Sequence, residues 1–115
     1  MADCLFCKIV KGEIPARIVK RFDDALAFRD IDARAPVHVL VIPTRHIAAV
    51  RDAKGGEGEK LLGRLLAFAA EVARDEGLDA EGYRIVTNTG KNAGQSVDHL
   101  HLHVLGGRKL SWPPG

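Results

Sequence analysis

Hydrophobic residues along the chain follow two spacings, one typical of a helix and one typical of strands. Over residues 61–73 they recur every three or four positions, which predicts an amphipathic helix that ends near Gly77. Residues 37–42 are almost all apolar and rich in β-branched side chains, between Pro36 and Pro43, which predicts a central strand. The chain therefore combines one long helix with strands.

Shorter patterns predict the remaining elements. Leu5–Val10 has the apolar spacing of a short helix that Asp3 can cap. The glycine-rich stretch 55–58 predicts a loop before the long helix. Further strands are predicted at Ile18–Arg21, Ala25–Arg29 and 83–87, and another runs through the histidine-rich stretch 99–104.

These elements follow one another in an order that suits hairpins. They predict an α+β fold with an antiparallel sheet of about five strands, in a single domain over residues 1–115. Hydrophobic residues make up 46% and charged residues 28% of the chain, an ordinary globular balance. No apolar stretch approaches the ~20 residues needed to cross a bilayer, so we expect a soluble protein without a membrane partner.

The charge of the chain and the composition of its first residues indicate which partners and which cellular compartment to expect. The net charge of +2 is compatible with a small anionic ligand. Lys and Arg are scattered and only six aromatic residues are present, which does not favour a nucleic-acid partner. The first residues lack a basic region followed by a long apolar run, so a cytoplasmic location is expected.

Three of the five histidines lie at alternate positions of the last predicted strand. Because alternate side chains of a strand share a face, His99, His101 and His103 should project together while Leu100 and Leu102 enter the core. A merely solvated sheet face would more often carry Thr, Ser, Lys or Glu. The pattern therefore favours a chemical role for the imidazoles.

Another histidine supports this interpretation. His38 interrupts the apolar central strand, so it should contact another polar group. Two chemistries suit such a cluster: zinc binding by neutral imidazoles, and nucleophilic attack by imidazole on phosphorus. The polar, glycine-containing loop 88–96 favours the second, because its backbone N–H groups and side chains can approach an anion.

The stretch "HLHLHVL" has the His-x-His-x-His pattern with apolar residues between, and it resembles the signature of the histidine triad (HIT) family of nucleotide hydrolases and transferases. The blocks "CKIVKGEIPARIV", "LAFRDIDARAPVHVLVIPTRHI", "GYRIVTNTG", "GQSV" and "HLHLHVLGGRKLSWPPG" resemble, in order and spacing, the HINT branch of histidine triad nucleotide-binding proteins. The resemblance covers nearly the whole chain and implies a HIT-like fold.

The resemblance implies a purine nucleoside 5′-phosphoramidate hydrolase that needs no cofactor for catalysis. His101 would attack the α-phosphorus and form a nucleotidyl-histidine intermediate, which water then resolves. The backbone carbonyl of His99 would hold one nitrogen of His101. His103, Ser96 and the backbone of 94–96 would contact the phosphate, and His38 would support the catalytic set. The implied nucleotide contacts are Phe6, Ile9, Phe28, Asp30, Ile31, Asn88, Gly94, Gln95, Ser96, His101, His103 and Trp112.

Within this set Asp30 would bind the ribose hydroxyls, and the apolar members would line the base pocket. From the residues alone, without the resemblance, plain core packing is the preferred explanation of Phe6, Ile9, Phe28 and Ile31. The C-terminal tail resembles the segment through which members of the family form dimers. This resemblance implies a homodimer whose sheet continues from one subunit to the other, with Trp112 reaching the partner's site. Trp112 could instead anchor its own tail.

Cys4 and Cys7 form a Cys-x-x-Cys pair. A redox role would require a thioredoxin-like setting that the sequence lacks. The resemblance to bacterial members of the family implies a structural zinc site completed by His46 and His99, with two unligated thiols as the alternative. Two other functions stay open: dinucleoside polyphosphate hydrolysis, and a nucleotide- or zinc-binding regulatory role.

Asp98 departs from the HINT pattern, which commonly has Tyr or Phe before the first histidine. Strand alternation predicts that its side chain points away from the histidines, either at the surface or bonded to a neighbouring loop. A carboxylate close to the imidazoles would raise their pKa values and move the pH optimum.

Overall fold

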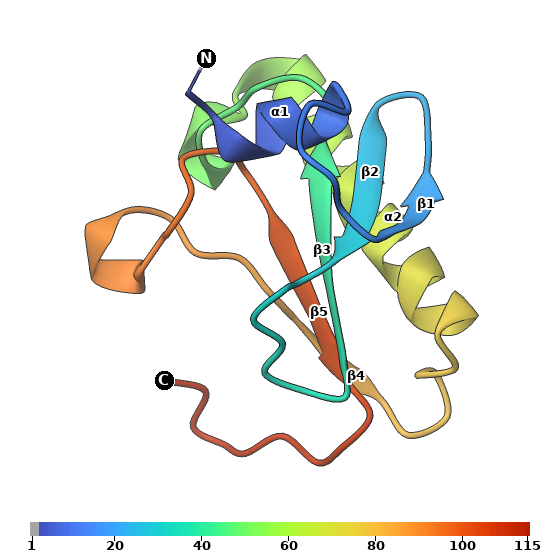
Figure 1. Ribbon diagram of the computed structural model, residues 1–115. Helices are drawn as coiled ribbons and strands as arrows, with labels where there is room; N and C mark the ends of the chain where they lie inside the picture. Colours follow the sequence, from blue (N-terminus) through green and yellow to red (C-terminus); the bar gives the residue numbers. More distant parts are fainter. Residues whose placement is uncertain (1–2) are drawn as a thin grey trace.

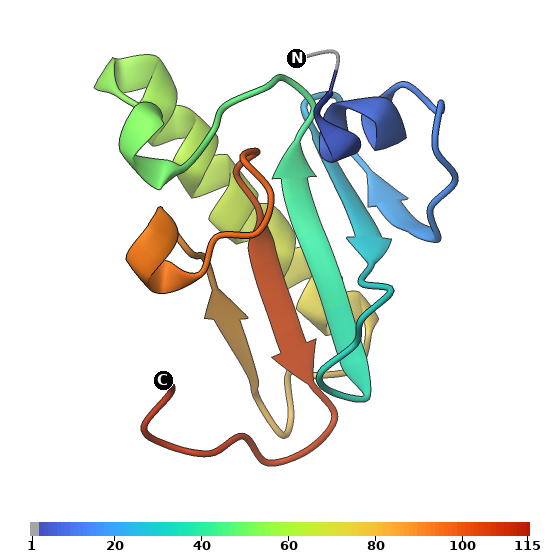
Figure 2. The same ribbon diagram turned by 60° about the vertical axis from the view of Figure 1, so that its left-hand side comes forward.

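The computed structural model describes residues 3–115 and has an α+β architecture. Five antiparallel strands form one sheet in the order β1-β2-β3-β5-β4, with the long helix α2 along one face and the short helix α1 at one end of the other (Figure 1, Figure 2). Two single-turn 3-10 helices, Val50–Asp52 and Lys91–Ala93, lie in connections. The main elements are α1 (Leu5–Val10), β1 (Ile18–Arg21), β2 (Ala25–Arg29), β3 (Val37–Pro43), α2 (Gly55–Asp75), β4 (Tyr83–Val86) and β5 (Leu102–Gly106).

Each face of the sheet has its own hydrophobic core, because alternate residues of a strand point to opposite sides. Val39 and Val41 of β3 pack with the apolar stripe of α2, and Leu100, Leu102 and Val104 join this core. On the opposite face, a second core is formed by Phe6, Ile9, Leu26, Phe28, Leu40 and Ile42. The sheet therefore has α2 on one side and a face left for chemistry on the other.

The histidine-rich stretch is only partly a paired strand. Its ladder with β3 begins at Leu102, opposite Val41, so His99 and His101 lie just before it. The last pair of this ladder, Val41 with Leu102, lies two residues before the end of β3 at Pro43, which has no N–H to donate. The N–H of Leu100 instead donates to the carbonyl of Ile47 at 2.6 Å. The predicted strand was therefore too long at its start, although Leu100 and Leu102 enter the core as expected.

Two local predictions were wrong. The cap of α1 is Cys4 rather than Asp3, and the Cys4 Sγ accepts a hydrogen bond from the Cys7 N–H at 3.4 Å. The glycine stretch 55–58 is the first turn of α2 rather than a loop. A Cβ at Gly58 would lie 2.3 Å from the backbone carbon of Ala53, so this glycine allows the chain to approach the helix closely.

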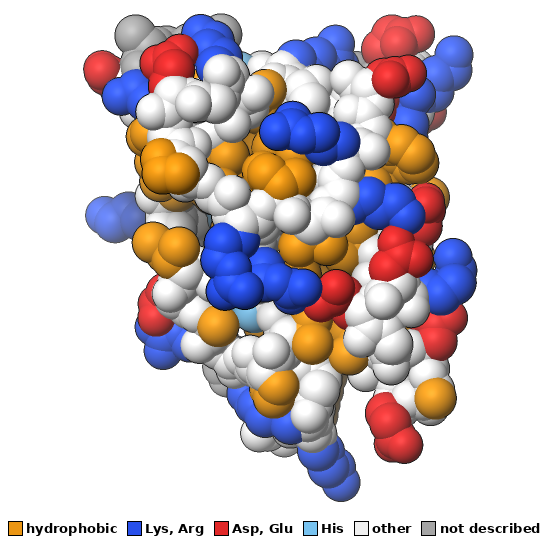
Figure 3. Space-filling model, turned by 45° about the vertical axis from the view of Figure 1, so that its right-hand side comes forward, with side chains coloured by type: hydrophobic (Ala, Val, Ile, Leu, Met, Phe, Trp, Pro, Cys, Tyr) orange, Lys and Arg blue, Asp and Glu red, His pale blue; other side chains and the backbone are white. Residues whose placement is uncertain are grey.

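The surface mixes charges of both signs. On the face in Figure 3, basic and acidic side chains surround smaller hydrophobic areas. Within residues 3–115, α2 and the other helices are too short or too polar to span a bilayer.

Two glycines of α2 provide a matched test of this packing. Gly58→Ala should destabilise the protein by about 1–3 kcal/mol, because the new methyl group meets the Ala53 backbone. Gly63→Ala, where a Cβ meets nothing within 4 Å, should stabilise it by about 0.5–1 kcal/mol through helix propensity. Urea unfolding measures both, and equal effects of the two substitutions would contradict the packing assigned to Gly58.

Candidate active site

His101 is held so that one of its ring nitrogens is free. Its Nδ1 lies 2.7 Å from the backbone oxygen of His99. Because a carbonyl oxygen can only accept, Nδ1 carries the proton and Nε2 keeps its lone pair. The ring is buried, and the edge of Phe6 packs on it with centroids 5.2 Å apart. The orientation of the His101 ring is thus fixed, with Nδ1 toward the His99 carbonyl and Nε2 away from it.

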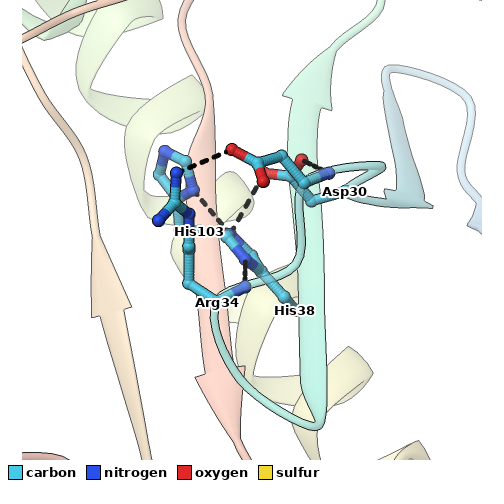
Figure 4. A network of polar contacts seen from close by, with 5 residues as sticks. Asp30, Arg34, His38 and His103 are labelled. Atoms are coloured by element: carbon cyan, nitrogen blue, oxygen red, sulfur yellow. Dashed lines mark hydrogen bonds and ion pairs between the residues drawn. The ribbon is translucent and has the colours of Figure 1, made fainter.

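A chain of polar contacts orients His103 (Figure 4). The N–H of Arg34 donates to His38 Nδ1 at 3.0 Å, so the His38 proton is on Nε2. This Nε2 lies 2.9 Å from His103 Nδ1 and 3.2 Å from Asp30 Oδ2. Since His103 Nδ1 accepts from His38, the His103 proton is on Nε2.

Burial keeps both of these histidines neutral. Burial, and to a smaller extent the neighbouring His101 and His38, lowers the pKa of His103 to about 4. Burial also lowers the pKa of His38, although the Asp30 carboxylate opposes this effect. At neutral pH His103 is therefore a hydrogen-bond donor without charge.

A cavity of about 230 Å³ opens beside these histidines. It brings together eight residues that the resemblance assigned to the nucleotide: Phe6, Ile9, Phe28, Asp30, Ile31, Ser96, His101 and His103. Ile31 is fully exposed, at the rim. Sequence reasoning missed Leu40, whose position two residues after His38 could have placed it on the same face. The other missed lining residues are Leu5, Ile14, Pro15, Ala16, Arg29 and Val97.

The remaining predicted nucleotide contacts lie outside this cavity. The side chain of Gln95 accepts from the Gly90 N–H at 2.8 Å and donates to the carbonyls of Ala48 and Val97 at 2.7 and 3.0 Å. It thereby braces the loop that carries Ser96. Asn88 and Gly94 do not line the cavity, and Trp112 is 78% exposed.

Four sulfur and nitrogen donors meet beside helix α1. Sγ of Cys4 lies 3.3 Å from His99 Nδ1, and Sγ of Cys7 lies 3.4 Å from His46 Nδ1 and 3.6 Å from His99 Nδ1. The four donor atoms are all within 4.8 Å of one another. His99 Nε2 donates to the Pro43 carbonyl at 2.9 Å, which leaves the Nδ1 lone pair facing the sulfurs. Two thiols and two imidazoles form a donor set that suits tetrahedral Zn²⁺.

Asp98 lies at the surface, which is one of the two positions expected of it. It is exposed and lines a hollow together with Cys4, His46 and Ser96. Strand alternation does not apply here, because the ladder begins only at Leu102. Asp98 therefore lies on the side of the sulfur and imidazole donors.

Comparison with known proteins gives consistent matches. The HIT domain family model matches residues 11–110. An uncharacterized HIT-like protein of Synechococcus elongatus is 54% identical over 113 residues, which cover 98% of this chain and 97% of that protein. The crystal structure of a HIT family hydrolase from Legionella pneumophila superposes with a TM-score of 0.94 at 50% identity, covering 98% of this chain and all of that one. A HIT family hydrolase from Clostridium thermocellum gives 0.91 at 42% identity, with 96% of each chain covered.

The lowered pKa of His103 predicts a pH-dependent stability. Between its ordinary value of 6.5 and about 4, the unfolded state binds a proton that the folded state does not. Stability should therefore be complete above pH 6.5 and decline toward pH 4, by about 1–2 kcal/mol from pH 7 to pH 5 for this residue. Urea unfolding at both pH values measures the loss. His103→Gln should show a smaller loss, and an undiminished pH dependence in that variant would contradict the assignment.

Proposed function

Because the chain belongs to the HIT-domain family, whose compared members include proteins named hydrolases, we propose that it hydrolyses purine nucleoside 5′-phosphoramidates. The observation that carries this proposal is the state of His101. Its Nδ1 donates to the backbone oxygen of His99, with 2.7 Å between the two atoms. Its Nε2 is free, beside a cavity whose lining residues suit a nucleoside. An imidazole with a free ring nitrogen is a competent nucleophile at phosphorus.

In the proposed reaction, His101 Nε2 forms a bond to the α-phosphorus as the phosphorus–nitrogen bond breaks. The departing nitrogen takes up a proton and leaves as an amine. Ser96, which lines the cavity, would relay that proton from a solvent water and so remain a neutral hydroxyl. Water then attacks the same phosphorus, releases the nucleoside monophosphate and restores His101. In both steps the bond that breaks at phosphorus lies opposite the incoming nucleophile.

His103 would stabilise the negative charge that develops on the phosphoryl oxygens. It is neutral, and its Nε2 proton is available because Nδ1 accepts from His38 at 2.9 Å. A neutral donor can stabilise the phosphoryl oxygens without having to be desolvated as a cation. Preorganised donors of this kind typically contribute about 3 kcal/mol each to transition-state stabilisation.

The nucleoside would occupy the rest of the cavity. Phe6, Ile9 and Phe28 supply an apolar wall for a base, with Phe6 and Phe28 packed edge to face at 5.4 Å. Asp30 lines the same cavity, and a carboxylate suits the two vicinal hydroxyls of ribose. Its Oδ1 accepts from the Asp32 N–H at 2.8 Å, which holds the carboxylate in position.

We further propose that Cys4, Cys7, His46 and His99 bind a structural zinc ion. Burial lowers the pKa of His99 and raises that of Cys7, so the imidazole is ready to bind a metal while the thiol needs a cation to lose its proton. The bound metal would link α1 to the segment before the catalytic strand. The His99 side chain would bind the metal, while its backbone carbonyl accepts the hydrogen bond from His101 Nδ1. One residue would therefore take part in both sites.

The active form is proposed to be a homodimer. Strand β4 lies at an edge of the sheet, where its free backbone groups can pair with another copy. Trp112 is largely exposed and lies outside the cavity of its own chain, which suits a residue that completes the partner's site.

His101→Ala tests the proposed nucleophile. Amine release from an adenosine 5′-phosphoramidate should fall by about a thousandfold or more, because no other nucleophile replaces the imidazole. Arg21→Gln, on the exposed edge strand β1, should keep wild-type turnover and controls for purification. Equal turnover by His101→Ala and the wild type would refute the mechanism, provided that both melt at similar temperatures.

Elemental analysis tests the zinc site. Protein purified without added zinc should contain about one atom per chain, and Cys7→Ser should lose most of it, because the thiolate is a ligand. Asp98→Asn, a neighbour in the same hollow that is not one of the four donors, should retain the metal. A zinc content far below one atom per chain in the wild type would refute the site.

A further inference from the structure

Three arginines from separate parts of the chain line a hollow of about 240 Å³ beside the C-terminal tail. Arg34 comes from the loop before β3, Arg84 from β4 and Arg108 from the segment after β5. Leu105 of β5 also lines the hollow. None of these arginines was predicted as a site residue, because they lie far apart in the sequence.

Two of these guanidinium groups are positioned by uncharged partners. Arg84 Nη2 donates to the Ser111 carbonyl at 2.9 Å, and Arg108 Nη2 donates to the Arg34 carbonyl at 2.8 Å. Among the ion pairs within residues 3–115, neither Arg84 nor Arg108 has a carboxylate. The hollow therefore presents positive charge without an anionic partner. Each guanidinium has further N–H donors, in the planar arrangement that matches phosphate oxygens.

The loop after β2 joins this hollow to the ribose side of the nucleoside cavity. Asp30, which is proposed to bind the ribose hydroxyls, accepts from the Asp32 N–H at 2.8 Å. Asp32 Oδ2 in turn pairs with Arg34 Nη2 at 2.9 Å, and the Arg34 N–H donates to His38 Nδ1 at 3.0 Å (Figure 4). One short loop therefore carries both the carboxylate for the ribose and an arginine of the hollow.

The sheet also places these two sites next to each other. His38 Nε2 lies 3.2 Å from Asp30 Oδ2. Leu105 is opposite His38 on β3 and opposite Arg84 on β4, so these side chains share a face, with about 4.5–5.5 Å between the Cβ atoms of opposite residues. Ser96, which is proposed to relay the proton to the leaving nitrogen, instead lines a hollow beside α1. The arginines thus adjoin the ribose rather than the leaving group.

We infer that the hollow of Arg34, Arg84 and Arg108 binds a phosphate group carried by the 2′ or 3′ oxygen of the ribose. The inference rests on the proposed function, because it uses the nucleoside orientation given there. Phosphorylation of one ribose hydroxyl leaves the other to donate to Asp30. The added phosphate would extend from Asp30 toward the guanidinium groups. The ligand class is therefore a nucleotide that is phosphorylated on its ribose as well as at the 5′ position.

Asp32 is the carboxylate that opposes an anion here, since it pairs with Arg34. Both side chains of this pair are 74% exposed, so the pair is weak and a phosphate can compete for the guanidinium. Removal of the Asp32 charge should therefore favour the phosphate. Damage to the loop would weaken binding instead, so this substitution separates the two effects.

Calorimetry of the full chain with three nucleotides tests the inference. Adenosine 3′,5′-bisphosphate or adenosine 2′,5′-bisphosphate should bind about tenfold more tightly than adenosine 5′-monophosphate. Arg34→Gln and Arg84→Gln should each remove most of this preference and change monophosphate binding by no more than about twofold, because neither residue lines the nucleoside cavity. Asp32→Asn should bind the preferred bisphosphate at least as tightly as the wild type does.

Arg21→Gln, on the edge strand β1, is the matched control for the loss of one positive charge. It should keep the wild-type ratio of bisphosphate to monophosphate affinity. An equal loss in this control would assign the preference to overall charge and overturn the inference. A ratio near one in the wild type, or an unchanged ratio in both Arg34→Gln and Arg84→Gln, would also overturn it.

The two bisphosphates distinguish the sources of the phosphate. Tighter binding of the 3′,5′ compound assigns the hollow to a 3′-phosphate, and tighter binding of the 2′,5′ compound assigns it to a 2′-phosphate. Equal binding that depends on the arginines means that the hollow accepts either.

Failure of the proposed function would give a different result. Cleavage of adenosine 5′-phosphoramidate is measured on the same preparations. Absent cleavage with an arginine-dependent preference for a bisphosphate would refute the phosphoramidase and support the phosphate site. Normal cleavage without that preference would refute the phosphate site alone. If none of the three nucleotides binds, the nucleoside placement and the inference are both overturned.

Discussion

The hydrogen bond between His101 Nδ1 and the carbonyl of His99, at 2.7 Å, is the contact on which the proposed chemistry depends. It assigns the proton of His101 and leaves Nε2 free. The carbonyl can do this because His99 itself is immobilised: its ring donates to Pro43 and faces the sulfurs of Cys4 and Cys7. The ladder between β3 and β5 stops at Val41 and Leu102, so His99 lies outside the strand pairing. The proposed nucleophile and the donor cluster are therefore joined through a single residue.

The two faces of the sheet have different roles, one in packing and one in the candidate site. One face packs on α2 and forms a continuous core, and this gives the strands a rigid support. On the other, apolar packing at the α1 end gives way to imidazoles and then to arginines along the same rows of side chains. Polarity therefore increases along this face of the sheet.

Burial sets the pKa values of three histidines around the site. Desolvation lowers the pKa values of His38, His99 and His103, so these rings act as neutral donors and acceptors with defined tautomers. Arg84 is half-buried and Arg108 is exposed, at the margin of this face. Hydrogen bonding within the site can thus be arranged without buried cations, and positive charge is kept at its margin.

The sequence by itself determined the class of fold, the strands Ile18–Arg21 and Ala25–Arg29, and the alternation that puts leucines into the core, because these follow from local spacing. It also indicated the residues that meet around the cavity, through a resemblance that spans the chain. Tertiary structure alone decided where β5 begins, since its pairing with β3 stops at Leu102 opposite Val41. It also decided that Gly58 lies within a helix, that Gln95 braces a loop, and that three distant arginines share a hollow. Each of these depends on contacts between segments far apart in the chain, which local patterns do not encode.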